Sequence, residues 1–531
     1  MNELHERLLL AVDLGTSGCK CALVGSDARV RRWAFRPAAL QVVGQTGIEQ
    51  DPEEWWRAFL EAAGEVLAAA READDEIVAI CCSCQGECTI AVDREGRPLH
   101  HALSWMDMRG RDSIRRIARG GPITVSGYDA FKLWRWIRRS GGAPSLSGKD
   151  PAGHIAFIRE AWPEVYERTY KFLNALDYMN LRLTGRFAAT ADSILTTWVT
   201  DNRDPNHIRY DASLLKQTGI DGVKLPEIVR STDVLGTLLP EVAAKLGLSA
   251  QTPVVAGAVD NSAAAIGAGA IADGETHLYI GTSSWLGAHV PFMRTDVFAE
   301  VASVPCAIPG RYLAVALQSA AGSNLANILD KFFDTRQERE EPAPDIYATV
   351  EKLAASAPAG AKGLLYTTWL CGERTPVNDP NLRASLLNLS LEHGRAEILR
   401  AVMEGVALNT RWMYEPFTRL LRKSPDRVTV VGGGAASDLW CQIFADVLGV
   451  AIRQVQSPIQ ANAVGAALIG FVGIGELQWK DIPPRIPIRN TYLPDRGNKA
   501  LYEEIYKRFK LAAKRLAVLH RNWNREERRR Q

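Results

Sequence analysis

A three-residue element, Gly-Thr-Ser, occurs once in each half of the chain, and this repeat constrains the fold more than any other feature. The copies are Gly15-Thr16-Ser17 and Gly281-Thr282-Ser283 in a chain of 531 residues. Each copy follows an apolar run typical of a strand and continues into a second apolar run. The repeat therefore predicts two related domains that face each other across a cleft. Such turns present backbone N–H groups and hydroxyls to phosphate oxygens, so the pair indicates nucleotide-dependent chemistry.

The length also favours two domains, because 531 residues exceed what one hydrophobic core supports. We expect the division at residues 1–255 and 256–531. The chain has 47% apolar residues, 23% charged residues and a net charge of +2, which is typical of a globular protein. This balance gives no reason to expect a nucleic acid or an acidic membrane as a partner.

The sequence also bears on the compartment. Acidic residues near the start argue against a signal peptide, and the small apolar stretch 254–272 contains Asp260, which argues against a membrane span. An odd count of nine cysteines favours a reducing compartment, so we expect a cytoplasmic protein. Four cysteines cluster without zinc-site spacing and are expected to be buried thiols: Cys81, Cys82, Cys84 and Cys88.

Strands and helices alternate along the chain, which predicts layered α/β domains. In the first half we expect strands at residues 8–13, 20–25, 30–35 and 77–83, and a helix at 52–72 capped by Asp51. In the second half we expect a hairpin at residues 276–290, strands at 313–318 and 428–431, and a long helix at 392–422. The composition of residues 140–153 and 336–345 predicts loops.

Asp13 ends the first predicted strand beside the first Gly-Thr-Ser turn. A carboxylate there can hold Mg²⁺ against nucleotide phosphates, directly or through water. The alternative is an Asp that caps its own turn. Lys20 follows on the next strand and can supply a positive charge to the phosphates, although alone it would be a surface lysine.

Asp260 lies in a run of small residues, 256–262. Burial of an unpaired charge is costly, so a carboxylate in such surroundings suggests a purpose. If it faces the cleft, Asp260 can accept the proton of an attacking hydroxyl, as phosphoryl transfer to an alcohol requires. The alternative is a helix N-cap, a duty that Asn261 and Ser262 would share.

Three glycines, Gly432-Gly433-Gly434, follow a predicted strand and precede a helix that begins near Ser437. Such a turn lets a flat base or a phosphate approach the backbone, although the pattern alone is a weak indication. The chain contains neither a P-loop motif nor a complete G-x-G-x-x-G fingerprint.

Polar residues set among apolar strands form a second candidate group. Gln85 and Glu87 follow one strand, and Trp105, Asp107 and Arg109 follow another. Amides, carboxylates and an apolar platform suit a polyhydroxylated ligand. The alternative is that Asp107 and Arg109 form a surface ion pair.

With these residues in place, the chain resembles the FGGY carbohydrate kinases from residue 8 to about residue 475. Motifs in one order carry the resemblance: Asp13-Leu-Gly-Thr-Ser, Trp105-x-Asp-x-Arg109, Asp177-Tyr-x-x-x-x-Leu-Thr-Gly185, Gly257-x-x-Asp-Asn261, Gly281-Thr-Ser283, Glu373-Arg-Thr-Pro376 and Gly432-Gly-Gly-Ala-x-Ser-x-x-Trp-x-Gln442. Many motifs in the same order are far more specific than any single one.

The resemblance implies two ribonuclease H-like domains of the actin–hexokinase superfamily, with ATP and Mg²⁺ bound in the cleft between them. It implies that Asp260 is the catalytic base and that Asp13 positions the metal. The residues implied to bind the nucleotide are Thr16, Ser17, Lys20, Thr282, Gly433, Gly434 and Ser437. Those implied to bind the sugar are Gln85, Glu87, Asp107, Asp260 and Asn261. The expected partners are a small sugar or polyol and ATP, with a homodimer left open.

Departures from the family patterns bear on the acceptor. Xylulose kinases have Gln-Met-His-Gly where this chain has Gln85-Gly-Glu-Cys88, and glycerol kinases have Gln-Arg-Glu-Thr, so Glu87 matches the latter. The pair Asp260-Asn261 follows the xylulose kinase type. The resemblance favours a ketopentose such as xylulose, with a glycerol- or tetritol-type polyol as the alternative. A non-enzymatic, actin-like ATP-binding switch is the alternative of another class.

Overall fold

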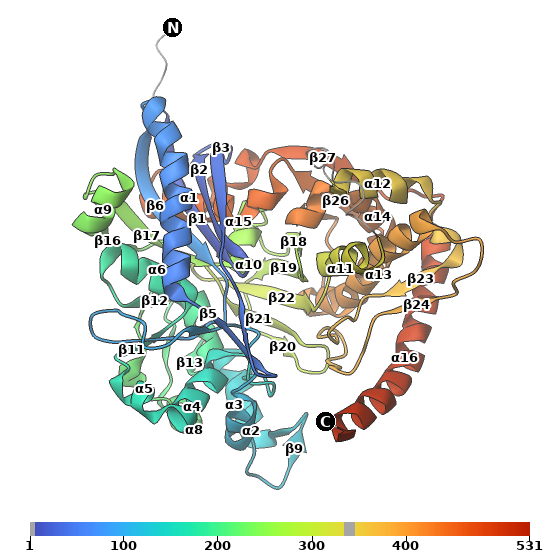
Figure 1. The fold of residues 1–531 in the computed structure, drawn as a ribbon, viewed down its shortest axis with the longest axis horizontal. Coiled ribbons are helices and arrows are strands. Elements are labelled where there is room, and N and C mark those ends of the chain that lie inside the picture. Colours follow the sequence, from blue (N-terminus) through green and yellow to red (C-terminus); the bar gives the residue numbers. More distant parts are fainter. Residues whose placement is uncertain (1–5, 334–345, 531) are drawn as a thin grey trace.

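The computed structural model describes residues 6–333 and 346–530. Its two largest sheets lie at the centres of two lobes, and helices cover them (Figure 1). The loop predicted at residues 336–345 lies outside the described residues.

The first sheet has six strands, built mainly from the start of the chain. Their order across the sheet is β16 (Val234–Thr237), β17 (Pro253–Val259), β6 (Glu76–Cys84), β1 (Arg7–Gly15), β2 (Gly18–Gly25) and β3 (Val30–Pro37). Strands β17, β6 and β1 run parallel, whereas β2, β3 and β16 are antiparallel to their neighbours. The parallel strands are buried, which explains why their sequences are almost continuously apolar.

The second sheet has eight strands. Their order is β20 (Thr295–Asp296), β21 (Val301–Pro305), β22 (Tyr312–Gln318), β19 (Ser284–Val290), β18 (Thr276–Ile280), β25 (Arg427–Val431), β26 (Ala451–Val455) and β27 (Ile488–Tyr492). The stretch from β27 to β22 repeats the order and directions of the stretch from β16 to β3. The predicted duplication is confirmed: hairpins β1–β2 and β18–β19 occupy equivalent places in the two sheets.

Helices pack on both sheets where the apolar pattern places them. Helix α1 spans Pro52–Glu72, and the Asp51 side chain accepts a hydrogen bond from the Glu53 N–H at 2.9 Å, as predicted for its cap. The apolar stripe of α1, including Trp55 and Phe59, is fully buried. The second lobe is covered by α11 (Gly322–Phe332), α12 (Ile346–Ser356), α13 (Arg395–Leu421), α14 (Asp438–Leu448) and α16 (Lys499–Arg530).

Two helices that are rich in small residues lie where the lobes meet. Helix α10 (Asp260–Gly267) follows β17, and α15 (Ala461–Gly473) follows the equivalent strand β26. A Cβ on Gly267 would lie 1.9 Å from the Ala461 carbonyl oxygen, and one on Gly465 would lie 1.9 Å from that of Ala263. The two helices therefore touch backbone to backbone, with the end of α10 against the start of α15.

A smaller α/β region with its own core follows β6 and lies at the lower end of the first lobe (Figure 1). It contains β7 (Ile90–Val92), α2 (Arg111–Ala118), α3 (Ala130–Ser140), α4 (Pro151–Ala161), α5 (Pro163–Arg168) and α8 (Ala212–Thr218), whereas the apolar side chains of α6 (Ala175–Thr184) belong to the core of the first sheet. The loop predicted at residues 140–153 is shorter, because α3 ends at Ser140 and α4 begins at Pro151. Pro151 suits the first turn of α4, because proline has no N–H and an N–H in the first turn would have no partner inside the helix.

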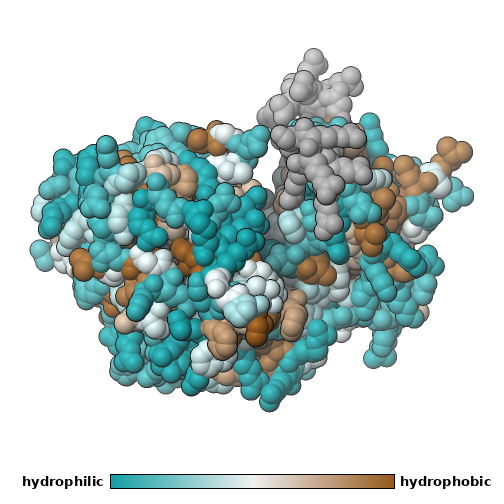
Figure 2. All heavy atoms as spheres, turned by 90° about the horizontal axis from the view of Figure 1, so that it is seen from below, coloured by the Kyte–Doolittle hydropathy of each residue, from teal (hydrophilic) through white to brown (hydrophobic). Residues whose placement is uncertain are grey.

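The cysteines follow the prediction. All nine are free and eight are buried, Cys371 being the exposed one. Within residues 6–333 and 346–530 no group of three or more His, Cys, Asp or Glu side chains is arranged to hold a metal ion. No helix in the same described part is long and apolar enough to cross a membrane. The surface seen from below is mostly hydrophilic, with apolar residues in small groups (Figure 2).

Candidate active site

Asp13 and Lys20 face each other across the first hairpin. They are register partners in β1 and β2, and the Lys20 Nζ lies 3.0 Å from the Asp13 Oδ2. Lys20 also donates a hydrogen bond to the Ile459 carbonyl oxygen at 3.0 Å, and the Asn462 Nδ2 lies 3.4 Å from the Asp13 Oδ1. The first hairpin is thus bonded to the start of α15, which belongs to the second lobe.

Asp260 opens α10 at this junction. Burial raises the pKa of its carboxyl to about 7, the charges of Asp13, Glu87 and Asp192 add to the rise, and the Asn261 N–H opposes it. The suggestion that Asp260 only caps its helix is wrong, because the N-cap residue is Val259. The Val259 N–H donates instead to the Asp192 carboxylate at 3.1 Å. The Asp260 carboxyl accepts a hydrogen bond from the Asn261 N–H in the first turn, and its pKa suits a general base near neutral pH.

The second hairpin approaches the same acids. Tyr279 in β18 is half-buried, and loss of solvent around its hydroxyl followed by the charges of Asp13 and Asp260 raises the pKa of its phenol. Its ring stacks on Trp285 of β19 with centroids 3.9 Å apart. The turn is held by the start of α11, since the Ala321 N–H donates to the Thr282 carbonyl oxygen at 2.8 Å. The Thr282 side chain is exposed at the tip of this fixed turn.

Thr16 links the first turn to the candidate sugar segment. Its hydroxyl donates to the Gln85 Oε1 at 2.9 Å and accepts a hydrogen bond from the Trp105 Nε1 at 3.0 Å. The Gln85 Nε2 donates to the Gln50 Oε1 at 2.8 Å, and Gln85 is only 3% exposed. Both ends of the Gln85 amide are therefore engaged within the protein, whereas Ser17 is exposed.

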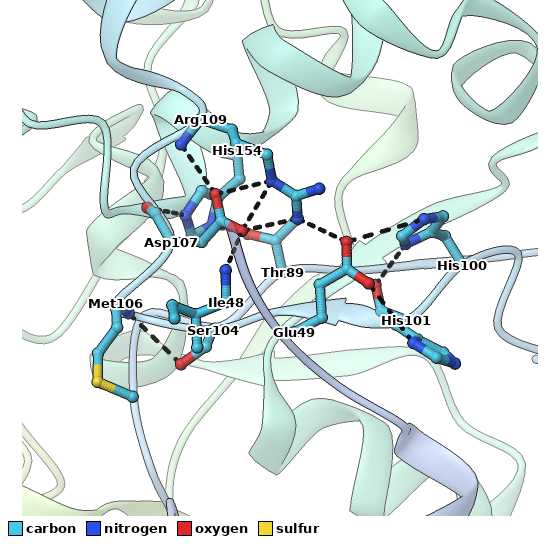
Figure 3. A network of polar contacts seen from close by, with 10 residues as sticks. All are labelled: Ile48, Glu49, Thr89, His100, His101, Ser104, Met106, Asp107, Arg109 and His154. Atoms are coloured by element: carbon cyan, nitrogen blue, oxygen red, sulfur yellow. Dashed lines mark hydrogen bonds and ion pairs between the residues drawn. The ribbon is translucent and has the colours of Figure 1, made fainter. Parts of the chain in front are cut away.

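Asp107 lies two residues after Trp105, which bonds to Thr16. Its side chain is fully buried, and its carboxylate accepts hydrogen bonds from the Ile48 N–H at 2.9 Å, the Arg109 N–H at 2.9 Å and the Arg109 guanidinium (Figure 3). Arg109 also bonds to Glu49 at 2.6 Å. The surface ion pair considered from the sequence exists as a buried one. These bonds hold the first lobe together, and the sugar contact expected of Asp107 stays a prediction.

His154 extends the same network. Its ring lies between the Thr89 hydroxyl at 3.0 Å and the Asp107 carbonyl oxygen at 3.1 Å, and burial lowers its pKa to about 4 (Figure 3). The imidazole is therefore neutral and bridges α4 to the segment that carries Asp107.

Lys149 and Arg374 were not predicted from the sequence, yet they adjoin Glu87. Burial and the charge of Arg374 lower the pKa of Lys149, whereas Glu87 opposes the shift. Glu87 has a left-handed backbone with φ of 63°, a conformation that costs about 1–3 kcal/mol outside glycine and collects at functional sites. Within the described chain neither Glu87 nor Lys149 forms a hydrogen bond or ion pair. Arg374 could have been found from the Glu373-Arg-Thr-Pro376 motif that contains it. Lys149 belongs to no motif or periodic pattern in the sequence.

The triple-glycine turn lies against the second hairpin. Gly432 has φ of 91°, and a Cβ there would lie 2.6 Å from the Ile280 carbonyl oxygen. By contrast, a Cβ on Gly433 would meet nothing within 4 Å, so open space lies before it. The Ser437 side chain accepts a hydrogen bond from the Trp440 N–H at 3.1 Å and caps α14. The Thr282 turn and the glycine turn therefore adjoin at the end of β18.

The donors around Asp13 suit Mg²⁺. Mg²⁺ in phosphoryl-transfer sites keeps several waters and takes one or two carboxylates together with substrate phosphates. Asp13 offers one carboxylate, and the buried Asn462 Oδ1 has no hydrogen-bond partner in the described residues. A hard cation held by Asp13, with Asn462 nearby, would satisfy that oxygen.

Comparison with known proteins agrees with this arrangement. The model of the FGGY family of carbohydrate kinases, N-terminal domain, matches residues 8–267, and that of the C-terminal domain matches residues 277–474. The chain belongs to the FGGY family of carbohydrate kinases. It is therefore a sugar kinase with ATP as co-substrate, and the actin-like switch is set aside.

The relatives differ in their sugars. A xylulose kinase of Bacillus subtilis (strain 168) is 30% identical, with 88% of this chain and 89% of that protein covered. A gluconokinase of Bacillus licheniformis is 24% identical, with 89% of each chain covered. The crystal structure of ligand-bound xylulose kinase from Lactobacillus acidophilus has a TM-score of 0.83 at 23% identity, covering 97% of this chain and 100% of that one, and shows the shared two-domain α/β fold.

Proposed function

We propose that this carbohydrate kinase transfers the terminal phosphoryl group of ATP to a hydroxyl of a ketopentose such as xylulose, with Asp260 as general base. The observation that carries the proposal is the raised pKa of Asp260, about 7, beside Asp13 at the junction of the lobes. A base with this pKa is ionised in part near neutral pH and still accepts a proton readily.

The other residues have separate duties in this proposal. Thr282 and Ser17 at the hairpin tips bind phosphate oxygens. Asp13 would hold Mg²⁺, and Lys20, which is paired with Asp13 in the structure, would then be available to the phosphates. Thr16 contributes through the backbone of its turn and not through its hydroxyl, because the hydroxyl is bonded to Gln85. Gly433, Gly434 and Ser437 form the surface for adenosine. Mg²⁺ supplies charge neutralisation on the phosphates.

The acceptor lies, in this proposal, between Asp260, Asn261 and Glu87. Lys149 and Arg374 donate to its oxygens, and Gln85 and Asp107 position the surrounding segments. Residues 1–255 would then carry the sugar side and the first phosphate turn, and residues 256–531 the nucleotide side.

The choice of a ketopentose is supported by the xylulose kinase relative and by the pair Asp260-Asn261. A glycerol- or tetritol-type polyol is the second candidate, and Glu87 favours it as a carboxylate in place of the histidine of xylulose kinases. The gluconokinase relative shows that similar chains serve other sugars.

Initial rates of ADP release, measured with a panel of pentuloses, aldonates and polyols, test the proposal. We expect the highest kcat/KM with a pentulose and a strict need for Mg²⁺. Turnover confined to glycerol or a tetritol would show that the acceptor is a polyol and not a ketopentose. Acceptor-dependent turnover that survives intact in Asp260→Ala would refute the mechanism.

A further inference from the structure

A hollow with a strongly basic lining lies between α3 and α8, on the small region of the first lobe. Its volume is about 750 Å³, within the range of small-molecule sites. Nine residues line it, and six of them are cations: Lys132, Arg135, Arg138, Arg139, Arg203 and Lys216. None of these nine described residues is acidic.

Three of the cations already have partners. Arg139 bonds to Asp211 at 2.9 Å, and Arg203 bonds to Asp201 at 2.7 Å. Lys132 donates to the Ile117 carbonyl oxygen at 2.7 Å, near the end of α2. Carboxylates thus compensate the charges of Arg139 and Arg203, whereas Lys132 is held by neutral carbonyl oxygens at the end of α2; the three contacts fix one side of the hollow.

The other three cations are not compensated. Arg135 donates only to the neutral Gln217 amide at 2.9 Å, and Arg138 lies over the Trp134 ring at 5.1 Å. Lys216 forms no hydrogen bond or ion pair within the described chain. Arg135 and Arg138 are three residues apart on α3, so they share one face of that helix, and Lys216 comes from the opposite wall on α8.

Like charges at this spacing repel one another, and a ligand with several negative charges removes that repulsion. Guanidinium groups bind phosphate oxygens through paired N–H donors, and an ammonium group adds a point charge. Trp134 is 58% exposed beside them and offers a flat apolar surface.

We propose that this hollow is a binding site, separate from the active site, for a small molecule that carries two or more phosphate groups. Arg135, Arg138 and Lys216 bind the phosphates, and Trp134 lies against the remainder of the ligand.

Inorganic pyrophosphate is the probe that tests this site, and calorimetry gives its Kd and stoichiometry. The variant Arg138→Gln/Lys216→Gln removes two uncompensated charges from exposed side chains. The matched control Lys507→Gln/Lys514→Gln removes two exposed charges from α16. We expect saturable, salt-sensitive binding to the wild type and the control, and a Kd at least about 10-fold higher at this site in the Arg138/Lys216 variant.

The charge-preserving variant Arg138→Lys/Lys216→Arg is expected to retain binding, which separates loss of charge from damage to the fold. Pyrophosphate bound at the active-site turns would remain in every variant as a second, unaffected site. The proposal is overturned if the wild type shows no saturable binding. It is equally overturned if the Arg138/Lys216 variant binds pyrophosphate with the same Kd and stoichiometry as the control.

Discussion

Asp260 has a pKa of about 7 because it is buried and because Asp13, from the other end of the first lobe's sequence, places a negative charge beside it. Asp13 lies near the end of β1, and Asp260 directly follows the end of β17. A cation held by Asp13 would remove part of that repulsion, so the proposed metal site and the ionisation of Asp260 should be linked.

The first prediction concerns Asp260→Asn. Loss of a general base typically lowers kcat by about 10²–10⁴-fold, so we expect a fall of that size with KM for ATP little changed. Steady-state kinetics with the preferred acceptor measure both. The conservative variant Asp260→Glu should retain more activity than Asn.

The same substitution has a pH-dependent effect on stability. The folded-state pKa of Asp260 is raised above its ordinary value of 3.8, so folding favours the neutral form and the wild type loses stability as pH rises between about 4 and 7. Asn cannot ionise. We expect Asp260→Asn to melt at the same temperature as the wild type near pH 4 and at least about 2 °C higher at pH 8. Equal melting temperatures at both pH values would contradict the buried position of this carboxyl.

The second prediction concerns Asp13→Asn. Without the Asp13 charge the pKa of Asp260 falls, so the acid limb of kcat/KM against pH should move to lower pH. The absolute rate should fall as well, because the proposed metal ligand is lost. Only the electrostatic effect of Asp13 on Asp260, however, moves the acid limb along the pH axis. If the acid limb stays at the same pH while the rate falls, Asp13 does not affect the ionisation of Asp260.

The third prediction concerns Asp107→Asn. This change removes the Asp107 charge from the half-buried Arg109, which keeps Glu49 as a partner at 2.6 Å, and weakens the bond from the Ile48 N–H. The free energy of unfolding should therefore fall by about 1–3 kcal/mol, and the melting temperature should fall with it. The matched control is Asp93→Asn, which breaks the Asp93–Arg97 pair of 3.0 Å on an exposed turn and should cost about 1 kcal/mol or less. KM for the acceptor should stay unchanged in folded Asp107→Asn. A raised KM with normal stability would restore Asp107 as a sugar ligand.

Some of the site could be predicted from the sequence, for physical reasons that differ by residue. The hairpins carry local signals, an apolar run and a glycine turn, so the duplication and the positions of Asp13 and Thr282 followed directly. The role of Thr16 depends on Gln85 and Trp105, which local sequence does not bring to it. Gln85 reaches Thr16 because β1 and β6 pair in the sheet, and Trp105 reaches it from the segment after β8 (Ala102–Leu103), which belongs to another sheet.

The rest of the site could not be predicted, because the sequence does not show which polar residues lie in the interior. A Trp-x-Asp-x-Arg pattern is compatible with a cleft or with an interior, and only packing against Ile48 and Glu49 decides for the interior. Lys149 lies in a glycine-rich loop without periodicity, so no pattern indicated that it would be buried beside charges from both lobes.

The fourth prediction concerns Lys149→Met. A hydrogen bond from a charged donor contributes about 1.5–3 kcal/mol, so kcat/KM for the acceptor should fall about 10–100-fold while KM for ATP stays unchanged. Lys245→Met, on the exposed side of α9 (Pro240–Leu246), is the control and should behave as the wild type. Equal losses for every acceptor and for ATP would place Lys149 on the nucleotide instead.

The last prediction uses two neighbouring glycines with opposite surroundings. Gly432→Ala places a Cβ at φ of 91° and 2.6 Å from the Ile280 carbonyl oxygen, so we expect a loss of stability of about 1–3 kcal/mol. Gly433→Ala meets nothing within 4 Å and should leave the melting temperature unchanged. If the open space before Gly433 receives adenosine, however, its new methyl group should raise KM for ATP. A Gly433→Ala enzyme with normal KM for ATP would move the nucleotide away from this turn, whatever Gly432→Ala does to the fold.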